Sequence, residues 1–187
     1  VNQSLSSGES SIEEIRFANG VSWTLRDVYS FLEPLVPTSG ADTLTGRQGA
    51  DRISAGDGAD RLTGGMGDDY LIGGRGNDTY VFNLGDGRDT ILDDGWNDTD
   101  TLEFGAGITL ADISASYIRD DLLLRVGAGG DQVLIRSISD ASRHRIEQFR
   151  FADGTTLSLT QMMAQAQIAS DGVDDIRGIG NLETLTG

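Results

Sequence analysis

An aspartate recurs every nine residues through the middle of the chain, and this spacing limits the fold more than any other feature. The copies that stay in register are Asp42, Asp51, Asp60, Asp69 and Asp78. A glycine stands two positions before each aspartate, and a large apolar residue stands two positions after it: Leu44, Ile53, Leu62, Leu71 and Tyr80. Self-similarity at so short a period predicts a stack of small units and not one broad core.

The repeat is most complete in its fourth and fifth copies, GGMGDDYLI (64–72) and GGRGNDTYV (73–81). After Asp78 the spacing widens, because Asp89 and Asp100 follow at intervals of eleven residues. Each of these is still followed, two positions later, by an apolar residue, Ile91 or Leu102. We therefore expect the repeat to run to about residue 104.

The composition of each turn predicts a cation site. Several glycines in one turn permit left-handed backbone conformations, so consecutive carbonyl oxygens can face a common centre. The aspartate that follows adds carboxylate oxygens. A site of six to eight oxygens favours Ca²⁺ over Mg²⁺, which retains its waters, and over Zn²⁺, which prefers His or Cys.

Two consecutive nonapeptides would form one coil, with a short strand in each half. Such coils would stack the aspartates along two edges and place calcium between the pairs 42/60, 51/69 and 60/78. The wider intervals predict looser pairs at 69/89 and 78/100. By this rule the segment would bind about five ions.

These repeats resemble the haemolysin-type calcium-binding repeats of the RTX (repeats-in-toxin) family. The resemblance implies an all-β fold, a right-handed parallel β-roll, in which each Ca²⁺ lies between turns that are two repeats apart. It implies ligation by the aspartates and by backbone carbonyls of the turns. The implied ligands are Asp42, Asp51, Asp60, Asp69, Asp78, Asp89, Asp100, Gly40, Gly46, Gln48, Gly49, Gly56, Gly58, Gly64, Gly65, Met66, Gly67, Gly73, Gly74, Arg75 and Gly76. Earlier copies depart from the pattern, with Pro37 to Ser39 before Gly40, Arg47 as the second residue of its copy and Ala55 as the first of its copy.

The sequence pattern changes over residues 105–169: glycines become less frequent, and apolar residues alternate with polar ones. Strands are expected at 116–118, 122–126 and 132–138, and a hairpin at 146–159 with Asp153-Gly154 as its turn. A helix is expected over 159–169 with Thr160 as N-cap. This segment resembles the β-rich region that often follows RTX repeats, and we expect it to cover the open end of the roll.

The N-terminal sequence IEEIRFANG (12–20) matches IEQFRFADG (146–154) at six of nine positions. We therefore interpret the chain as a portion of a tandem array of similar units. Residues 1–36 would end one unit with a hairpin and a short helix. Residues 37–104 would be the β-roll, 105–169 its capping segment, and 170–187 the start of the next repeat block.

Charge and composition exclude several classes of function. The 30 acidic and 14 basic residues give a net charge of -16, which disfavours nucleic acids and anionic membranes as partners. The chain has no cysteine and a single histidine, His144, so thiol chemistry is absent and imidazole chemistry is scarce. No apolar run approaches the ~18 residues of a transmembrane helix.

We predict a non-enzymatic, calcium-binding structural module of a large secreted RTX protein. The resemblance implies export through a type I system, as part of an adhesin or toxin. The module would be unfolded at low calcium and would fold in extracellular calcium, next to neighbouring units of the same polypeptide. Two alternatives remain open: a module that binds glycans or a cell surface, and the tail of a secreted hydrolase.

Overall fold

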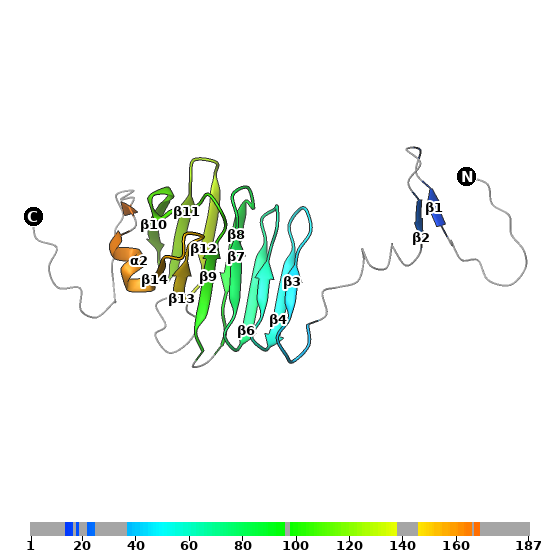
Figure 1. Cartoon of the computed structure of the whole chain (residues 1–187), viewed down its shortest axis with the longest axis horizontal. Coiled ribbons are helices and arrows are strands. Elements are labelled where there is room, and N and C mark those ends of the chain that lie inside the picture. Colours follow the sequence, from blue (N-terminus) through cyan, green and yellow to red (C-terminus); the bar gives the residue numbers. More distant parts are fainter. Residues whose placement is uncertain are drawn as a thin grey trace, which may run out of the picture. The chain divides into compact units, whose positions relative to one another are not determined.

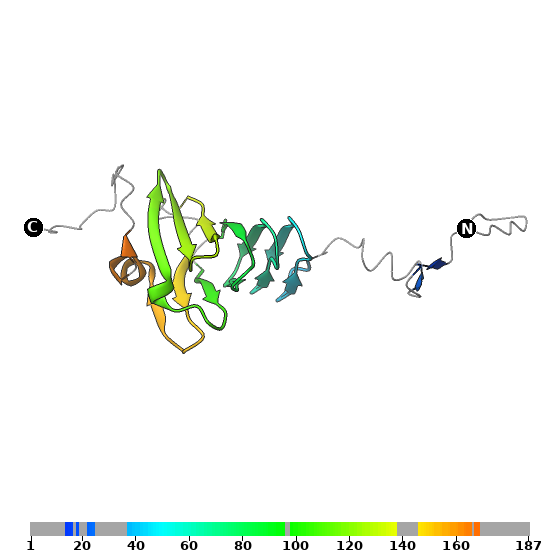
Figure 2. The same ribbon diagram turned by 90° about the horizontal axis from the view of Figure 1, so that it is seen from above.

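The nine-residue period folds into short strands that alternate between two sheets. In the computed structural model, residues 14–16, 18, 22–24, 37–95, 98–137, 146–165 and 167–168 are described. The chain divides into two compact units, Val1–Val36 and Pro37–Gly187. Figure 1 shows the strands of the second unit side by side, and Figure 2 shows the same strands from above.

Within the roll, each strand pairs in parallel with the strand two repeats further along the chain. One sheet contains β3 (Thr43–Thr45), β5 (Arg61–Thr63), β7 (Thr79–Phe82) and β9 (Asp100–Phe104). The other contains β4 (Arg52–Asp57), β6 (Tyr70–Arg75) and β8 (Arg88–Leu92). The predicted coil of two repeats is confirmed by the register, in which Leu44 lies opposite Leu62 and Ile53 opposite Leu71.

The interior of the roll is filled by the apolar residue of each repeat. In a strand, successive side chains point to opposite faces, so the residue two positions after each aspartate faces inward. These residues are all buried, and they stack in two columns: Leu44, Leu62, Tyr80 and Leu102 in one, and Ile53, Leu71 and Ile91 in the other. The predicted inward positions are therefore confirmed.

The flanking segment continues both sheets of the roll. After the short 3-10 helix η1 (Leu110–Asp112), three antiparallel strands follow: β10 (Ile113–Ile118), β11 (Asp121–Val126) and β12 (Asp131–Ile135). The hairpin of β13 (Ile146–Arg150) and β14 (Thr156–Ser158) is also formed. Because β12 pairs in parallel with β8 and β13 with β9, the backbone edges at this end of the roll are occupied. The expected β-rich capping segment is confirmed.

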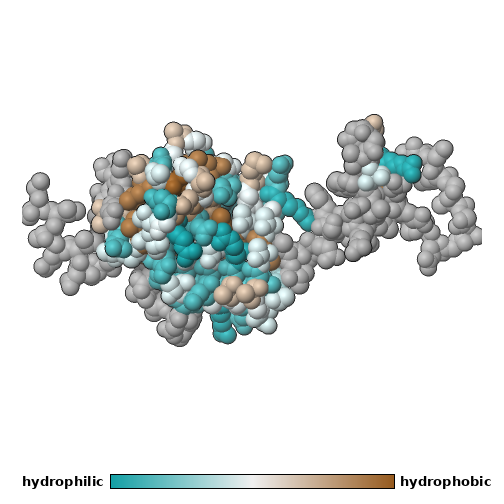
Figure 3. Space-filling view, viewed as in Figure 1, coloured by the Kyte–Doolittle hydropathy of each residue, from teal (hydrophilic) through white to brown (hydrophobic). Residues whose placement is uncertain are grey.

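The core is continuous from the roll into the cap. Phe104 stacks on Phe151 with ring centroids 5.0 Å apart, and Phe149 and Met162 are fully buried. On the face shown in Figure 3, hydrophilic residues dominate over the coils, while hydrophobic residues gather over β10–β12. The larger apolar core of the cap gives it stabilisation that the narrow coils lack.

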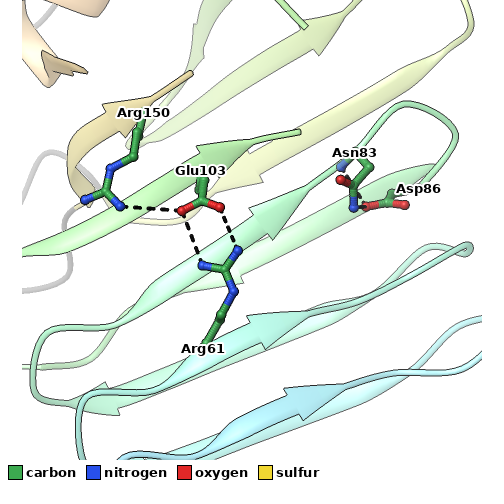
Figure 4. Close-up of polar contacts among 5 residues, drawn as sticks. All are labelled: Arg61, Asn83, Asp86, Glu103 and Arg150. Atoms are coloured by element: carbon green, nitrogen blue, oxygen red, sulfur yellow. Dashed lines mark hydrogen bonds and ion pairs between the residues drawn. The ribbon is translucent and has the colours of Figure 1, made fainter. Parts of the chain in front are cut away.

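An ion-pair network joins the roll to the cap on the outer side of the six-stranded sheet (Figure 4). Arg61 of β5 donates to both carboxylate oxygens of Glu103 on β9, at 2.6 and 3.2 Å, and Arg150 of β13 lies 3.5 Å from the same carboxylate. The Arg61 hydrogen bond lowers the pKa of Glu103. Because all three side chains are partly exposed, each pair contributes at most about 1 kcal/mol.

The helical prediction was wrong in its length and in its cap. The helix α2 covers only Leu159–Gln165, and Gln167–Ile168 form strand β15, which pairs in parallel with β10. The Ser158 hydroxyl accepts a hydrogen bond from the Gln161 N–H, and the Gln161 side chain accepts one from the Ser158 N–H. This reciprocal pair caps the helix in place of Thr160.

No helix in the described part of the chain is long and apolar enough to span a bilayer.

The first unit contains a hairpin with the same register as the β13–β14 hairpin. Strand β1 (Glu14–Arg16) pairs antiparallel with β2 (Ser22–Thr24), with Ile15 opposite Trp23. In the second unit the equivalent positions of the repeated sequence are Phe149 and Leu157, which also lie opposite each other. The short helix expected before residue 37 and the repeat block expected at 170–187 lie outside the described residues.

Tyr80 provides a test of how tightly the coils depend on buried polar contacts. Its hydroxyl accepts a hydrogen bond from the Gly73 N–H at 2.8 Å, and its side chain is fully buried. Tyr80→Phe should leave this N–H without an acceptor and lower the free energy of unfolding by about 1–3 kcal/mol. Urea unfolding of the full chain measures the loss.

The matched control is Tyr70→Phe, because the Tyr70 ring lies on the outer side of β6, with the Arg52 guanidinium 4.5 Å from its centroid. Tyr70→Phe should change the free energy of unfolding by no more than about 0.5 kcal/mol, as other surface substitutions do. Equal losses in the two variants would show that the Gly73–Tyr80 hydrogen bond does not support the coil.

Candidate cation site

The repeated aspartates form two hydrogen-bonded ladders along the edges of the roll. In each step the backbone N–H of one aspartate donates to Oδ1 of the aspartate in the next coil. The five pairs are Asp42–Asp60 (2.7 Å), Asp51–Asp69 (2.7 Å), Asp60–Asp78 (2.8 Å), Asp69–Asp89 (3.1 Å) and Asp78–Asp100 (2.7 Å). The structure thus brings together every aspartate pair expected from the sequence, including the two at longer spacing.

The second oxygen of each inner aspartate is buried without a hydrogen-bond donor. This holds for Oδ2 of Asp60, Asp69, Asp78, Asp89 and Asp100, whose residues are only 1–2% exposed. An unsatisfied carboxylate oxygen in the interior costs several kcal/mol unless a positive charge compensates it. These oxygens are where a cation fits the structure.

The first aspartate on each edge, Asp42 or Asp51, differs from the aspartates that follow it in the chain. Oδ2 of Asp42 accepts the Thr38 N–H at 2.6 Å, and Oδ2 of Asp51 accepts the Arg47 N–H at 2.6 Å. Both donors belong to the same turn as the aspartate they bind. At the start of the roll, the protein itself therefore satisfies the oxygen that stays unsatisfied in later coils.

Burial raises the pKa of several inner aspartates. It brings the pKa of Asp78 and of Asp89 to about 7, and the neighbouring aspartates add like-charge repulsion. Burial, followed by contact with the Asp93 carboxyl, raises the pKa of Asp100 further. Burial therefore opposes the ionised form in this part of the ladder, and a nearby cation would favour the carboxylate.

The turn glycines allow the coils to stack at very short distance. Gly67 has φ +150°, and a Cβ there would overlap the carbonyl oxygen of Gly49 in the coil below. A Cβ on Gly58 or Gly76 would likewise meet the carbonyl oxygen of Gly40 or Gly58. Carbonyl oxygens of one turn thus face the backbone of the next, which only glycine permits.

The structure places the other expected ligands in the same stacked turns. Gly46 and Gly65 lie against the carbonyl oxygens of Gly64 and Arg47, and Gly74 lies against that of Gly56. The carbonyl oxygens of Met66 and Arg75 accept hydrogen bonds from the N–H groups of Gly49 and Gly58, at 2.6 and 2.8 Å. Their side chains, like that of Gln48, are exposed, so these residues can contribute only backbone oxygens.

Two acidic residues near the end of the ladder were missed by the sequence interpretation. Asp93 lies with Asp78 and Asp100 so that one carboxylate oxygen from each falls within 4.8 Å of the others. Glu147 accepts the Asp100 N–H at 2.9 Å and so takes the place of a further aspartate. Glu147 sits at an irregularity in the pairing of β13 with β9, and such bulges redirect a side chain. Counting from Leu92 as the equivalent of Ile72 could have identified Asp93, whereas no sequence signal marks the bulge.

The atoms that could ligate a metal in these turns are all oxygens. The buried groups along both edges are carboxylates and backbone carbonyls, which suit a hard cation such as Ca²⁺ and not Zn²⁺. His144 and Trp96 lie outside the described residues.

Comparison with protein families agrees with this geometry. Residues 38–71, 45–80 and 61–91 match the model of the RTX calcium-binding nonapeptide repeat. Residues 121–161 match the haemolysin-type calcium binding protein related domain. The two matches fall on the roll and on the cap.

Among solved structures, the chain is similar to the solution structure of the AlgE6R3 subunit from the Azotobacter vinelandii mannuronan C5-epimerase. The two share 24% sequence identity over 82% of this chain and 96% of that chain, with a TM-score of 0.26. A TM-score this low does not support any transfer of activity between them.

Close stacking of the turns can be tested at two glycines that hold the same position in their repeats. Gly49 has φ +99° and no atom near its would-be Cβ, whereas a Cβ on Gly67 would overlap the Gly49 carbonyl. Gly67→Ala should therefore reduce the free energy of unfolding by about 1–3 kcal/mol more than Gly49→Ala, which introduces backbone strain alone. Thermal or urea unfolding of the two variants measures the difference, and equal losses would contradict the stacking.

Proposed function

Since this chain carries the haemolysin-type calcium-binding repeats of the RTX family, we propose that the stacked turns of residues 37–104 bind a column of calcium ions along each edge of the roll. We propose further that this binding is what folds the module. The ligands would be the ladder aspartates together with carbonyl oxygens of the turn glycines, Gln48, Met66 and Arg75. The five aspartate pairs correspond to about five ions.

The observation that carries the proposal is the buried Oδ2 of each inner aspartate. These oxygens have no hydrogen-bond donor within the protein, and burial raises the pKa of several of the carboxyls that bear them. A divalent cation between two such carboxylates removes both the desolvation cost and the repulsion. Mutual repulsion along the ladder opposes folding until cations neutralise it.

The magnitude of the calcium effect makes the module a sensor of its surroundings. An ion bound only by the folded form stabilises it by RT ln(1 + [L]/Kd). With Kd of about 10⁻⁴ to 10⁻³ M, millimolar calcium contributes roughly 1 kcal/mol per site, while cytosolic calcium contributes almost nothing. Because inner aspartates are shared between sites, binding of one ion positions a ligand of the next site, so binding is cooperative.

Such a module suits a protein that crosses a secretion channel unfolded and folds outside the cell. We therefore assign it to a secreted protein, exported by a type I system as part of a larger polypeptide such as an adhesin or toxin. Its role there is structural: it folds, extends and spaces neighbouring units when calcium is present. Catalysis would belong to other parts of the polypeptide.

Shared aspartates give the test of calcium binding. Asp60 pairs with both Asp42 and Asp78, whereas Asp42 pairs with one partner. Asp60→Asn keeps the acceptor for the Asp42 N–H but removes the charge, so it should lose more bound calcium than Asp42→Asn. Isothermal titration calorimetry on the full chain measures the number of ions.

Asp57→Asn is the control, because Asp57 is exposed and lies outside the ladder, so this variant should bind as many ions as the wild type. Binding of one ion or none by the wild type would contradict the proposal. Equal losses in Asp60→Asn and Asp42→Asn would show that the sites are separate and not stacked.

A further inference from the structure

We propose that Asp78, Asp93 and Asp100 form a three-carboxylate cation site in the last turn of the roll, and that this site holds its ion more tightly than the two-aspartate sites below it. The inference rests on the proposed function and adds a ligand to it. Asp93 and Asp100 lie beyond the residues matched by the nonapeptide repeat model, which end at 91.

The register of the sheet places Asp93 where the preceding coil has Gly73. Leu71 lies opposite Ile91 and Ile72 opposite Leu92, so Asp93, the residue after β8, is the counterpart of Gly73 within β6. At Gly73 a Cβ would overlap Oδ2 of Asp78, and at Gly64 a Cβ would overlap Oδ2 of Asp69. In these two turns the space beside the aspartate cannot hold a second side chain.

The last turn is longer and therefore has the room. Asp100 follows Asp93 by seven residues, whereas Asp78 follows Gly73 by five. The two additional residues let the carboxyl of Asp93 enter the ladder beside that of Asp100. The same turn brings Asp98 to the backbone, where its Oδ2 accepts the Gly76 N–H at 3.1 Å. Asp98 thus holds the stack together while Asp93 faces the ladder.

The three carboxyls are enclosed and close enough to share one ion. Each residue is at most 2% exposed, and one carboxylate oxygen from each falls within 4.8 Å of the others. Oδ2 of Asp78 and Oδ2 of Asp100 have no hydrogen-bond donor. Three buried carboxylates this close together repel one another, and a cation between them compensates both the repulsion and the lost hydration.

A third carboxylate changes the chemistry of the site relative to its neighbours. It adds one negative charge, with oxygens within 4.8 Å of one another, in an enclosed position where charge interactions are stronger than at the surface. The preferred ion remains a hard, oxygen-seeking cation, and Ca²⁺ satisfies this requirement. We expect it to leave at least about tenfold more slowly than the others, the change that 1.4 kcal/mol of added stabilisation produces.

The test is the release of calcium from the loaded full chain, mixed rapidly with excess fluorescent chelator. The wild type should release one ion in a slow phase, separate from the rest. Asp93→Asn and Asp93→Gly should lose the slow phase and retain the total number of ions to within one. Asp93→Gly restores the residue found at Gly64 and Gly73, so it provides a second variant with a turn already accepted elsewhere in the roll.

Asp94→Asn is the matched control, because Asp94 is adjacent in sequence, carries the same charge and is exposed. It should keep the slow phase. A slow phase that survives in both Asp93 variants, or disappears in Asp94→Asn, would overturn the assignment. So would the loss of more than one ion, or of calcium-dependent folding, in both Asp93 variants while Asp94→Asn is normal. Failure of the wild type to bind calcium at all would instead refute the proposed function.

Discussion

The structure depends on one constraint: each inner aspartate buries a carboxylate whose two oxygens are treated differently. Oδ1 accepts a backbone N–H from the coil below, and Oδ2 is buried without a donor. The first interaction fixes the register of the coils, because a slip by one residue would break every step of the ladder at once. The second leaves a buried charge that the proposed cations would compensate. Register and cation binding are therefore properties of the same side chain.

The turns and the cap follow from this constraint. Oxygens can gather around a cation only if adjacent turns approach closely, and residues such as Gly67 allow this because they have no Cβ to meet the carbonyl below. At its far end the ladder stops at Glu147, which accepts the Asp100 N–H from a strand of the cap. The pairing of β12 with β8 and of β13 with β9 joins narrow coils to a broader apolar core. The cap thus ends both the sheets and the carboxylate ladder.

The repeat region was predictable because its period encodes geometry directly. A spacing of nine residues specified which aspartates would stack and which apolar side chains, such as Leu62 and Tyr80, would face inward. The 153–154 turn was predictable as well, since Asp-Gly favours a tight connection. In each case the signal is local, or repeats at fixed distance.

The features that sequence reasoning missed depend on contacts between distant segments. The end of α2 is set by the pairing of β15 with β10. Helix propensity alone predicted a helix that continues through the residues of β15. Glu147 reaches the ladder through an irregularity in a sheet whose strands are more than forty residues apart. Asp93 joins the cluster because its turn is longer than those before it, so a strict repeat pattern passes over it.

The central claim is that cations complete the roll, and circular dichroism combined with limited proteolysis of the full chain tests it most directly. The spectra are compared in chelator, in a few millimolar CaCl₂ and in the same concentration of MgCl₂, which controls for ionic strength and for divalent charge. We predict that the β signal and the protease resistance of residues 37–104 develop in calcium and are lost in chelator, with Mg²⁺ unable to replace Ca²⁺. The same β signal and the same resistance in all three solutions would contradict the account.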